Sequence, residues 1–216
     1  MKYTHYLLVL AIAGLLFGAC SNESNKNTKK NSEEMSMDHS EHAKMDMATG
    51  EPTGESIYNV NSSWKTRHGH TVKLDSLRGK IQVVAMVYTS CEYACPRILT
   101  DMKRIRDGLP DKALRQTNFL IVSIDPERDT PGKLKQFAKG NDLDNNHWTL
   151  LHGQDGDILE LAALLGFKYK RISETDFTHS TLITLLNQEG EIIYQRKKLS
   201  DKPNKVVENI KQAVAE

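Results

Sequence analysis

Hydrophobic and polar residues follow one another along residues 57–216 in a pattern that predicts alternating strands and helices. Continuous apolar, β-rich runs are typical of strands buried on both faces of a sheet. Two such runs lie at residues 80–89 and 118–125, and a shorter one lies at 147–153. Apolar residues at helical spacing predict helices at residues 96–109, 131–139, 157–166 and 204–216. The first two of these begin with a proline, which suits the first turn of a helix.

Two hairpins complete the pattern. Residues 56–66 and 70–77 read as a short strand pair around the turn "HGH", and residues 180–197 predict a hairpin around a Gln-Glu-Gly turn. Strands that alternate with helices, followed by an antiparallel hairpin and a last helix, favour an α/β domain. The prediction is a mixed central sheet flanked by helices, with an N-terminal β-hairpin, in the element order of the thioredoxin-like fold.

Residues 1–19 resemble a bacterial lipoprotein signal peptide. Lys2 precedes an apolar stretch at residues 7–17, which suits a signal peptide and is too short for a confident membrane span. The ending "GAC" is similar to a lipobox, although Phe17 stands where an aliphatic residue is usual. Cys20 would then carry the lipid that anchors the exported chain to a membrane, facing the periplasm or cell exterior. The competing interpretation is an uncleaved anchor with an incidental cysteine.

Residues 20–56 predict a disordered tether. From residue 21 onward they contain no Leu, Ile, Val, Phe, Tyr or Trp, so they cannot bury enough apolar surface to fold. Thioether suits Cu(I), and imidazole suits copper in both oxidation states. The tether carries both, at Met35, Met37, His39, His42, Met45 and Met47. It reads either as a linker that happens to be Met-rich or as a copper-collecting arm with exchangeable accessory ligands.

Charge and cysteine content exclude several classes of protein. The chain has 29 Lys and Arg against 28 Asp and Glu, a net charge of +1, and such a chain has no basic field to attract nucleic acid. Its three cysteines are too few for a small disulfide-built domain. We therefore expect no nucleic-acid partner.

Cys91 and Cys95 follow the first buried strand and precede a helix. Because proline is favoured at the first helical position, Pro96 places Cys95 about at the N-cap and Cys91 one turn earlier. The positive end of the helix dipole favours thiolate there. With three residues between them, the cysteines can close as a disulfide or open to bind an ion. The alternative is an inert structural disulfide, whose small loop would stabilise little.

Three segments together resemble the Sco/SenC family of copper-binding assembly factors of cytochrome c oxidase. They are "GKIQVVAMVYTSCEYACP", "FLIVSIDPERDTP" and "DFTHSTLITLLNQEG". The resemblance covers nearly all of residues 57–216. It implies a thioredoxin-like domain that binds one copper ion, Cu(I) or Cu(II), through Cys91, Cys95 and His179. It also implies a copper-accepting subunit of cytochrome c oxidase, or of a related enzyme, as partner. The interior "CEYAC" departs from the commoner Pro-Asp sequence, which bears on partner contacts.

The chemistry of these residues agrees with that resemblance. Two thiolates and one imidazole suit three-coordinate Cu(I), with room for a further ligand on Cu(II), whereas structural zinc normally takes four ligands. Thioredoxins usually carry a cis-proline before the next buried strand, but no proline occurs between Pro131 and Pro203. That absence favours a metal site over a dedicated disulfide exchanger.

The segment "DPERDTP" supplies two further candidates. Asp125 ends the second buried strand, and the carboxyl ends of parallel strands converge on one site. We expect Asp125 to lie behind the ligands and modulate thiol ionisation or metal charge. Asp129 precedes Thr130 and Pro131 and is expected to cap the following helix.

Two functions are compatible with the sequence. A metallochaperone would bind copper through Cys91, Cys95 and His179 and pass it on. A thiol–disulfide oxidoreductase would reduce the acceptor's cysteines and would need Cys91 and Cys95 but not His179. A thiol peroxidase is disfavoured, because Val84 and Tyr88 stand where peroxiredoxins carry Pro and Thr or Ser before the reactive cysteine.

Overall fold

The structure is a computed structural model that describes residues 54–198 and 203–215. These residues belong to one compact unit. Cys20 and the tether's candidate ligands lie outside the described residues, namely Met35, Met37, His39, His42, Met45 and Met47. Among the described residues, no helix has the length and apolar character needed to cross a membrane.

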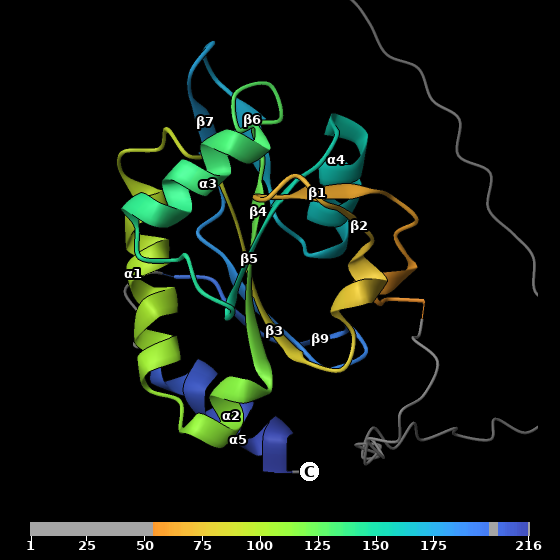
Figure 1. The fold of residues 1–216 in the computed structure, drawn as a ribbon, viewed down its shortest axis with the longest axis vertical. Coiled ribbons are helices and arrows are strands. Elements are labelled where there is room, and N and C mark those ends of the chain that lie inside the picture. The colour runs from red at the N-terminus through yellow and green to blue at the C-terminus, as the bar shows by residue number, and fades with distance from the viewer. Residues whose placement is uncertain (1–53, 199–202, 216) are drawn as a thin grey trace, which may run out of the picture. The chain divides into compact units, whose positions relative to one another are not determined.

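A seven-stranded mixed sheet forms the centre of the domain, in the order β2-β1-β5-β4-β3-β8-β9 (Figure 1). The inner strands β3, β4 and β5 are parallel, and the strands on either side join antiparallel. The strands are β1 (Trp64–Thr66), β2 (Thr71–Val72), β3 (Ile81–Val87), β4 (Thr117–Ser123), β5 (Trp148–His152), β8 (Ile183–Leu186) and β9 (Ile192–Arg196).

The strands β3 and β4 are buried along their whole length, as their apolar runs predict. They pair in parallel from Ile81 opposite Thr117 to Val87 opposite Ser123. Because both strands end level, the loops that follow them emerge at the same edge of the sheet. One loop carries Cys91 and leads into the helix that contains Cys95, and the other carries the "DPERDTP" segment.

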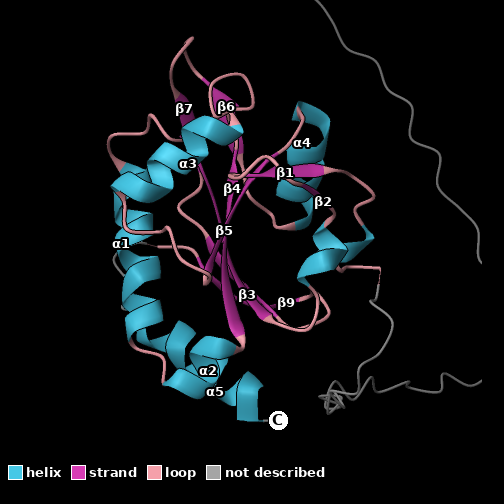
Figure 2. Cartoon of the chain, viewed as in Figure 1, coloured by secondary structure: helices cyan, strands magenta, loops and turns pink. Residues whose placement is uncertain are grey.

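Helices flank the central strands, with α1 and α3 on one side and α4 on the other (Figures 1 and 2). The helices are α1 (Ala94–Asp107), α2 (Asp111–Arg115), α3 (Pro131–Gly140), α4 (Asp155–Leu164) and α5 (Asn204–Ala215). The short helix α2 is not predicted by the sequence pattern. The predicted α/β class, with its mixed sheet and flanking helices, is confirmed.

The N-terminal hairpin is shorter than predicted. β1 and β2 pair around Gly69, whose φ of +84° suits the tight turn. The flanking residues form the 3₁₀ helices η1 (Ile57–Asn59) and η2 (Leu74–Leu77) rather than strands. Ile57 and Tyr58 are adjacent and both buried, which the alternating faces of a half-buried strand do not allow.

A second, two-stranded sheet consists of β6 (Tyr169–Arg171) and β7 (Phe177–His179). His179 is the last residue of β7. The strands are antiparallel, with Tyr169 opposite His179 and Arg171 opposite Phe177. We call residues 169–179 the His179 hairpin, which stands at the top of Figure 2.

Candidate metal centre

The loop between β3 and α1 places the two cysteines differently from the prediction. The helix N-cap is Tyr93 and α1 begins at Ala94, so Cys95 lies inside the first turn rather than at the cap. Pro96 is tolerated in the third helical position because the first backbone N–H groups of a helix have no partner inside it. Cys95 is buried, whereas Cys91 is partly exposed. The Cys95 N–H donates to the Cys91 sulfur at 3.4 Å.

His179 lies beside both sulfurs. Its Nε2 atom is 3.9 Å from Cys91 Sγ and 3.7 Å from Cys95 Sγ, and the three possible ligand atoms lie within 4.8 Å of one another. The Nδ1 atom is 2.8 Å from the Ser180 carbonyl oxygen. That oxygen can only accept, so Nδ1 carries a hydrogen and Nε2 is the ring nitrogen that faces the sulfurs.

Aromatic rings fix the orientation of the imidazole. Phe167 stacks on His179 with ring centroids 5.9 Å apart and planes inclined by 25°. Tyr88 meets the imidazole edge-on at 5.8 Å and packs on Phe177 at 5.2 Å. The Tyr88 hydroxyl donates to Asp176 at 2.9 Å. Neither Tyr88 nor Phe167 could be assigned to the site from the sequence, because ring contacts across distant segments leave no local pattern.

The two thiols differ in acidity. Burial by itself raises the pKa of Cys91, but hydrogen bonds from His179 and from backbone N–H groups outweigh it and lower that pKa to about 6. Burial raises the pKa of Cys95 far above its usual range, and the negative charges of Cys91 and Asp129 add to the rise. Near neutral pH, Cys91 is therefore a thiolate and Cys95 a thiol.

Asp129 does not cap α3, contrary to the prediction. Thr130 is the N-cap, and its hydroxyl oxygen accepts from the Lys133 N–H at 3.3 Å. Asp129 is fully buried and accepts hydrogen bonds from Ser123 Oγ at 2.6 Å and from the Thr89 backbone at 2.9 Å, as well as from the Thr89 hydroxyl. It therefore ties the start of the cysteine loop to the end of β4.

Asp125, the predicted modulator of the site, is also fully buried. Its carboxylate forms ion pairs with Arg128 at 2.5 Å and with Arg171 at 3.7 Å. Of the two aspartates, Asp129 is the one whose charge acts on Cys95. The expectation that Asp125 modulates the thiols or the metal stays a prediction.

Comparison with known proteins gives a consistent result. The SCO1/SenC family model matches residues 51–215. A SCO1 protein homolog of Bacillus subtilis is 26% identical over 155 residues, which are 70% of this chain and 80% of the relative. The fold is similar to that of a SCO1/SenC family lipoprotein from Bacillus anthracis, with a TM-score of 0.66, 22% identity and coverage of 78% of this chain and 100% of the other.

Bradyrhizobium japonicum ScoI, crystallised with copper bound, is also similar in structure, with a TM-score of 0.60 and 24% identity. The similarity covers 70% of this chain and 96% of that chain. The family match spans the whole described domain, and the residues it includes bring two cysteines and a histidine together. The chain therefore belongs to the SCO1/SenC family.

Proposed function

We propose that this chain is an exported, membrane-anchored copper-binding protein that delivers copper to, or prepares, the copper centre of cytochrome c oxidase or a related enzyme. One observation carries the proposal. Cys91 Sγ, Cys95 Sγ and His179 Nε2 lie within 4.8 Å of one another, although His179 follows Cys95 by 84 residues. Two soft sulfurs and an imidazole nitrogen form a donor set that suits copper.

The spacing of these atoms fits one small ion. Metal bonds of about 2.0–2.3 Å, as zinc makes to nitrogen and sulfur, separate neighbouring ligand atoms by about 3.5–4 Å. The two sulfur–nitrogen distances, 3.9 and 3.7 Å, lie in that range. Cys91 is already a thiolate near neutral pH, so of the two sulfurs only that of Cys95 has a proton for copper to displace. The amino end of α1 helps to offset the net charge of −1 on Cu(I) with two thiolates.

Delivery is proposed to proceed by ligand exchange. His179 is held by packing and one hydrogen bond on a small hairpin, so a donor of the acceptor can replace its neutral nitrogen on the copper. The remaining parts of this proposal concern residues 1–56. We infer that residues 1–19 are a signal peptide, that Cys20 carries the lipid anchor, and that the tether's methionines and histidines collect copper. The B. anthracis relative, named a lipoprotein, supports the anchor.

A second candidate function is thiol–disulfide exchange, which the unequal acidity of Cys91 and Cys95 favours. The Cys91 thiolate would attack one sulfur of an acceptor disulfide and release the other as a thiolate. After losing its proton, Cys95 would attack Cys91, free the reduced acceptor and leave a Cys91–Cys95 disulfide. A thiol reductant would then restore the pair.

Copper binding by the reduced full chain, with wild type and His179→Ala side by side, separates the two functions. The copper proposal predicts one ion per wild-type chain and loss of the thiolate-to-Cu(II) charge-transfer absorption in His179→Ala. The exchange proposal predicts that His179→Ala still reduces an oxidised acceptor at nearly the wild-type rate, at a pH where Cys91 is ionised in both proteins. A wild-type chain without stoichiometric copper would exclude the metallochaperone function.

A further inference from the structure

The His179 hairpin forms a sheet of its own, apart from the seven-stranded sheet that carries the cysteine loop. His179 can stay beside the sulfurs only if other contacts hold this hairpin in place. The rings around His179 supply one set of contacts. A second set lies farther along the hairpin, toward its turn, and consists of charged residues.

Arg128 and Arg171 link the hairpin to the turn that follows β4. Arg128, in that turn, donates through Nε to Asp125 at 2.5 Å and through Nη2 to the Thr175 carbonyl oxygen in the hairpin at 2.6 Å. Arg171, on β6, reaches back to Glu127 at 3.0 Å and to Asp125 at 3.7 Å. Each arginine therefore links the hairpin to the turn after β4. We call Asp125, Glu127, Arg128 and Arg171 the arginine clamp.

Arg171 also acts within the hairpin. Its Nη1 donates to the Glu174 carbonyl oxygen at 3.2 Å, and its guanidinium lies 4.8 Å from the centre of the Phe177 ring. Phe177 is two residues before His179 on the same strand, so the two side chains share a face. The position of Arg171 is thereby connected to the position of the imidazole through one strand.

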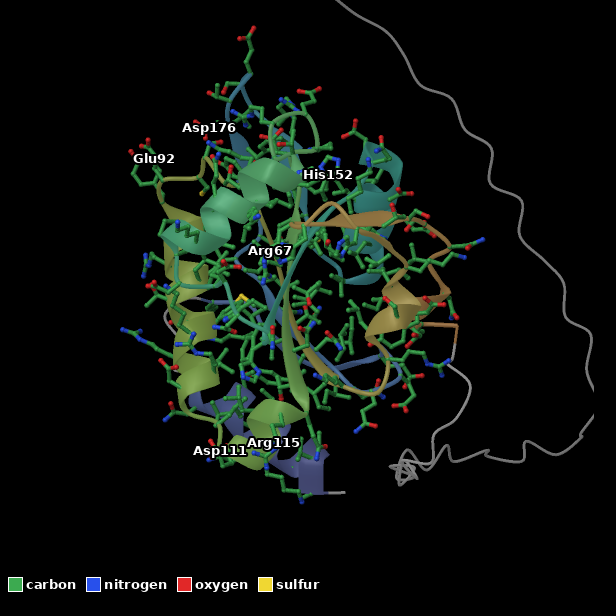
Figure 3. The ribbon with its side chains drawn as sticks, in the orientation of Figure 1. Arg67, Glu92, Asp111, Arg115, His152 and Asp176 are labelled. Carbon is green, nitrogen blue, oxygen red and sulfur yellow. The ribbon has the colours of Figure 1, made fainter. Side chains whose placement is uncertain are left out.

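The burial of Asp125 makes the clamp costly to open. Its carboxylate is fully buried, and a buried charge needs paired partners because it has lost its water. When the hairpin moves away, Asp125 loses Arg171, and Arg128 loses the Thr175 carbonyl. The hydrogen bond from Tyr88 to Asp176 in the hairpin also opposes this movement; Asp176 is labelled at the upper left of Figure 3.

We propose that Arg128 and Arg171 are positioning residues for His179: the arginine clamp holds the hairpin so that Nε2 reaches a copper ion bound by Cys91 and Cys95. The proposal rests on the copper function proposed above. It gives Asp125 a role through the hairpin rather than through direct contact with the thiols. Opening the clamp converts a three-ligand site into a two-sulfur site, which retains Cu(I) and holds Cu(II) poorly.

The test uses the reduced full chain with Arg171→Met. This substitution keeps the length of the side chain and its apolar stem but removes the charge. We expect one Cu(I) per chain as in wild type. We expect the Cu(II) charge-transfer spectrum to change toward that of His179→Ala, and Cu(II) release to a chelator to accelerate about tenfold or more, the usual scale for residues that orient metal ligands. Arg171→Lys should restore most of the wild-type rate. Arg115→Met, on α2 at the opposite end of the molecule in Figure 3, is the matched control.

Two further measurements keep the inference testable. Should Arg171→Met lose the wild-type circular dichroism spectrum, Glu127→Gln replaces it, because Glu127 is exposed and its substitution weakens only one arm of the clamp. In the metal-free protein, proton–proton contacts by NMR between His179 and Tyr88 should weaken in the clamp variants. Unchanged release, spectrum and ring contacts in folded variants would overturn the positioning role. Failure of wild type to bind copper, with ring contacts still dependent on Arg171, would instead count against the copper function alone.

Discussion

At the scale of single residues, the site gives two chemically identical side chains different acidities. Cys91 lies in front of α1, where it accepts the Cys95 N–H and faces the imidazole. Cys95 lies inside the first turn, where protein atoms replace water. The amino end of α1 thus lies beside both a thiolate and a buried thiol. Disulfide exchange uses this asymmetry directly, whereas copper binding needs both sulfurs as thiolates.

Alkylation of the metal-free protein should reveal this asymmetry. With a pKa of about 6, the Cys91 thiolate forms as pH rises through 6, so its reaction with iodoacetamide should reach half its maximal rate near that pH. Cys95 should stay unlabelled through pH 8. Peptide mapping by mass spectrometry distinguishes the two sites.

The variant His179→Ala should shift the Cys91 midpoint to higher pH, because it removes a hydrogen bond that stabilises the thiolate. His68→Ala, in the exposed turn between β1 and β2, should leave the midpoint unchanged. Equal labelling of both cysteines in wild type would contradict the account.

At the scale of elements, the site depends on how loops are joined at one edge of the sheet. Asp129, from the loop after β4, accepts hydrogen bonds from Thr89, at the start of the cysteine loop. The arginine clamp joins the same loop to the His179 hairpin. The "DPERDTP" segment therefore fixes both halves of the site without supplying a ligand.

Substituting Asp129 by alanine should destabilise the fold by about 3 kcal/mol or more, because the donors of Thr89 and Ser123 lose their acceptor inside the protein. Denaturation by urea measures the change in the free energy of unfolding. Asp129→Asn, which keeps the volume and one acceptor oxygen, should lose less. Glu160→Ala, at an exposed position on α4, should change stability by less than about 0.5 kcal/mol. Equal stability of Asp129→Ala and wild type would show that these bonds do not hold the loop.

The sequence predicts the elements that depend on local pattern and misses those that depend on distant partners. The runs of β3 and β4 and the helical spacing of α1 and α3 are local signals, and the structure confirms these elements. The start of α1 is wrong by two residues because proline suits more than one first-turn position.

The site shows the same division between local and distant signals. The resemblance supplies the trio Cys91, Cys95 and His179, which the structure brings together. The role of Asp129 was misread because "DTP" is a capping pattern whose middle residue, not its first, makes the cap. Tyr88, Phe167 and Arg171 act across segments far apart in the chain, so no spacing rule could identify them.

At the scale of the whole molecule, the described domain holds one candidate metal trio among its described residues, and a Met/His-rich segment precedes it in the chain. Soft, exchangeable donors on a tether would raise the chance of capturing copper near the domain without changing the final site. Changes in the tether and changes in the domain should therefore affect copper loading in different ways.

Deletion of residues 21–50 should leave copper stoichiometry and the charge-transfer spectrum unchanged at saturating copper. Loading should fall when copper is scarce and competes with a chelator, because the local supply of weak ligands is lost. Replacing the tether's methionines and histidines with serine at constant length is the matched control, since it separates ligand loss from shortening. Equal loading of all three proteins under scarcity would remove the tether from copper capture.

X-ray absorption of the Cu(I)-loaded full chain tests the central claim most directly, because it identifies the atoms bound to copper. The account predicts two sulfur neighbours and one nitrogen neighbour in wild type, with the nitrogen lost in His179→Ala and both sulfurs retained. A nitrogen neighbour that persists in His179→Ala, or a wild-type site with a single sulfur, would contradict it.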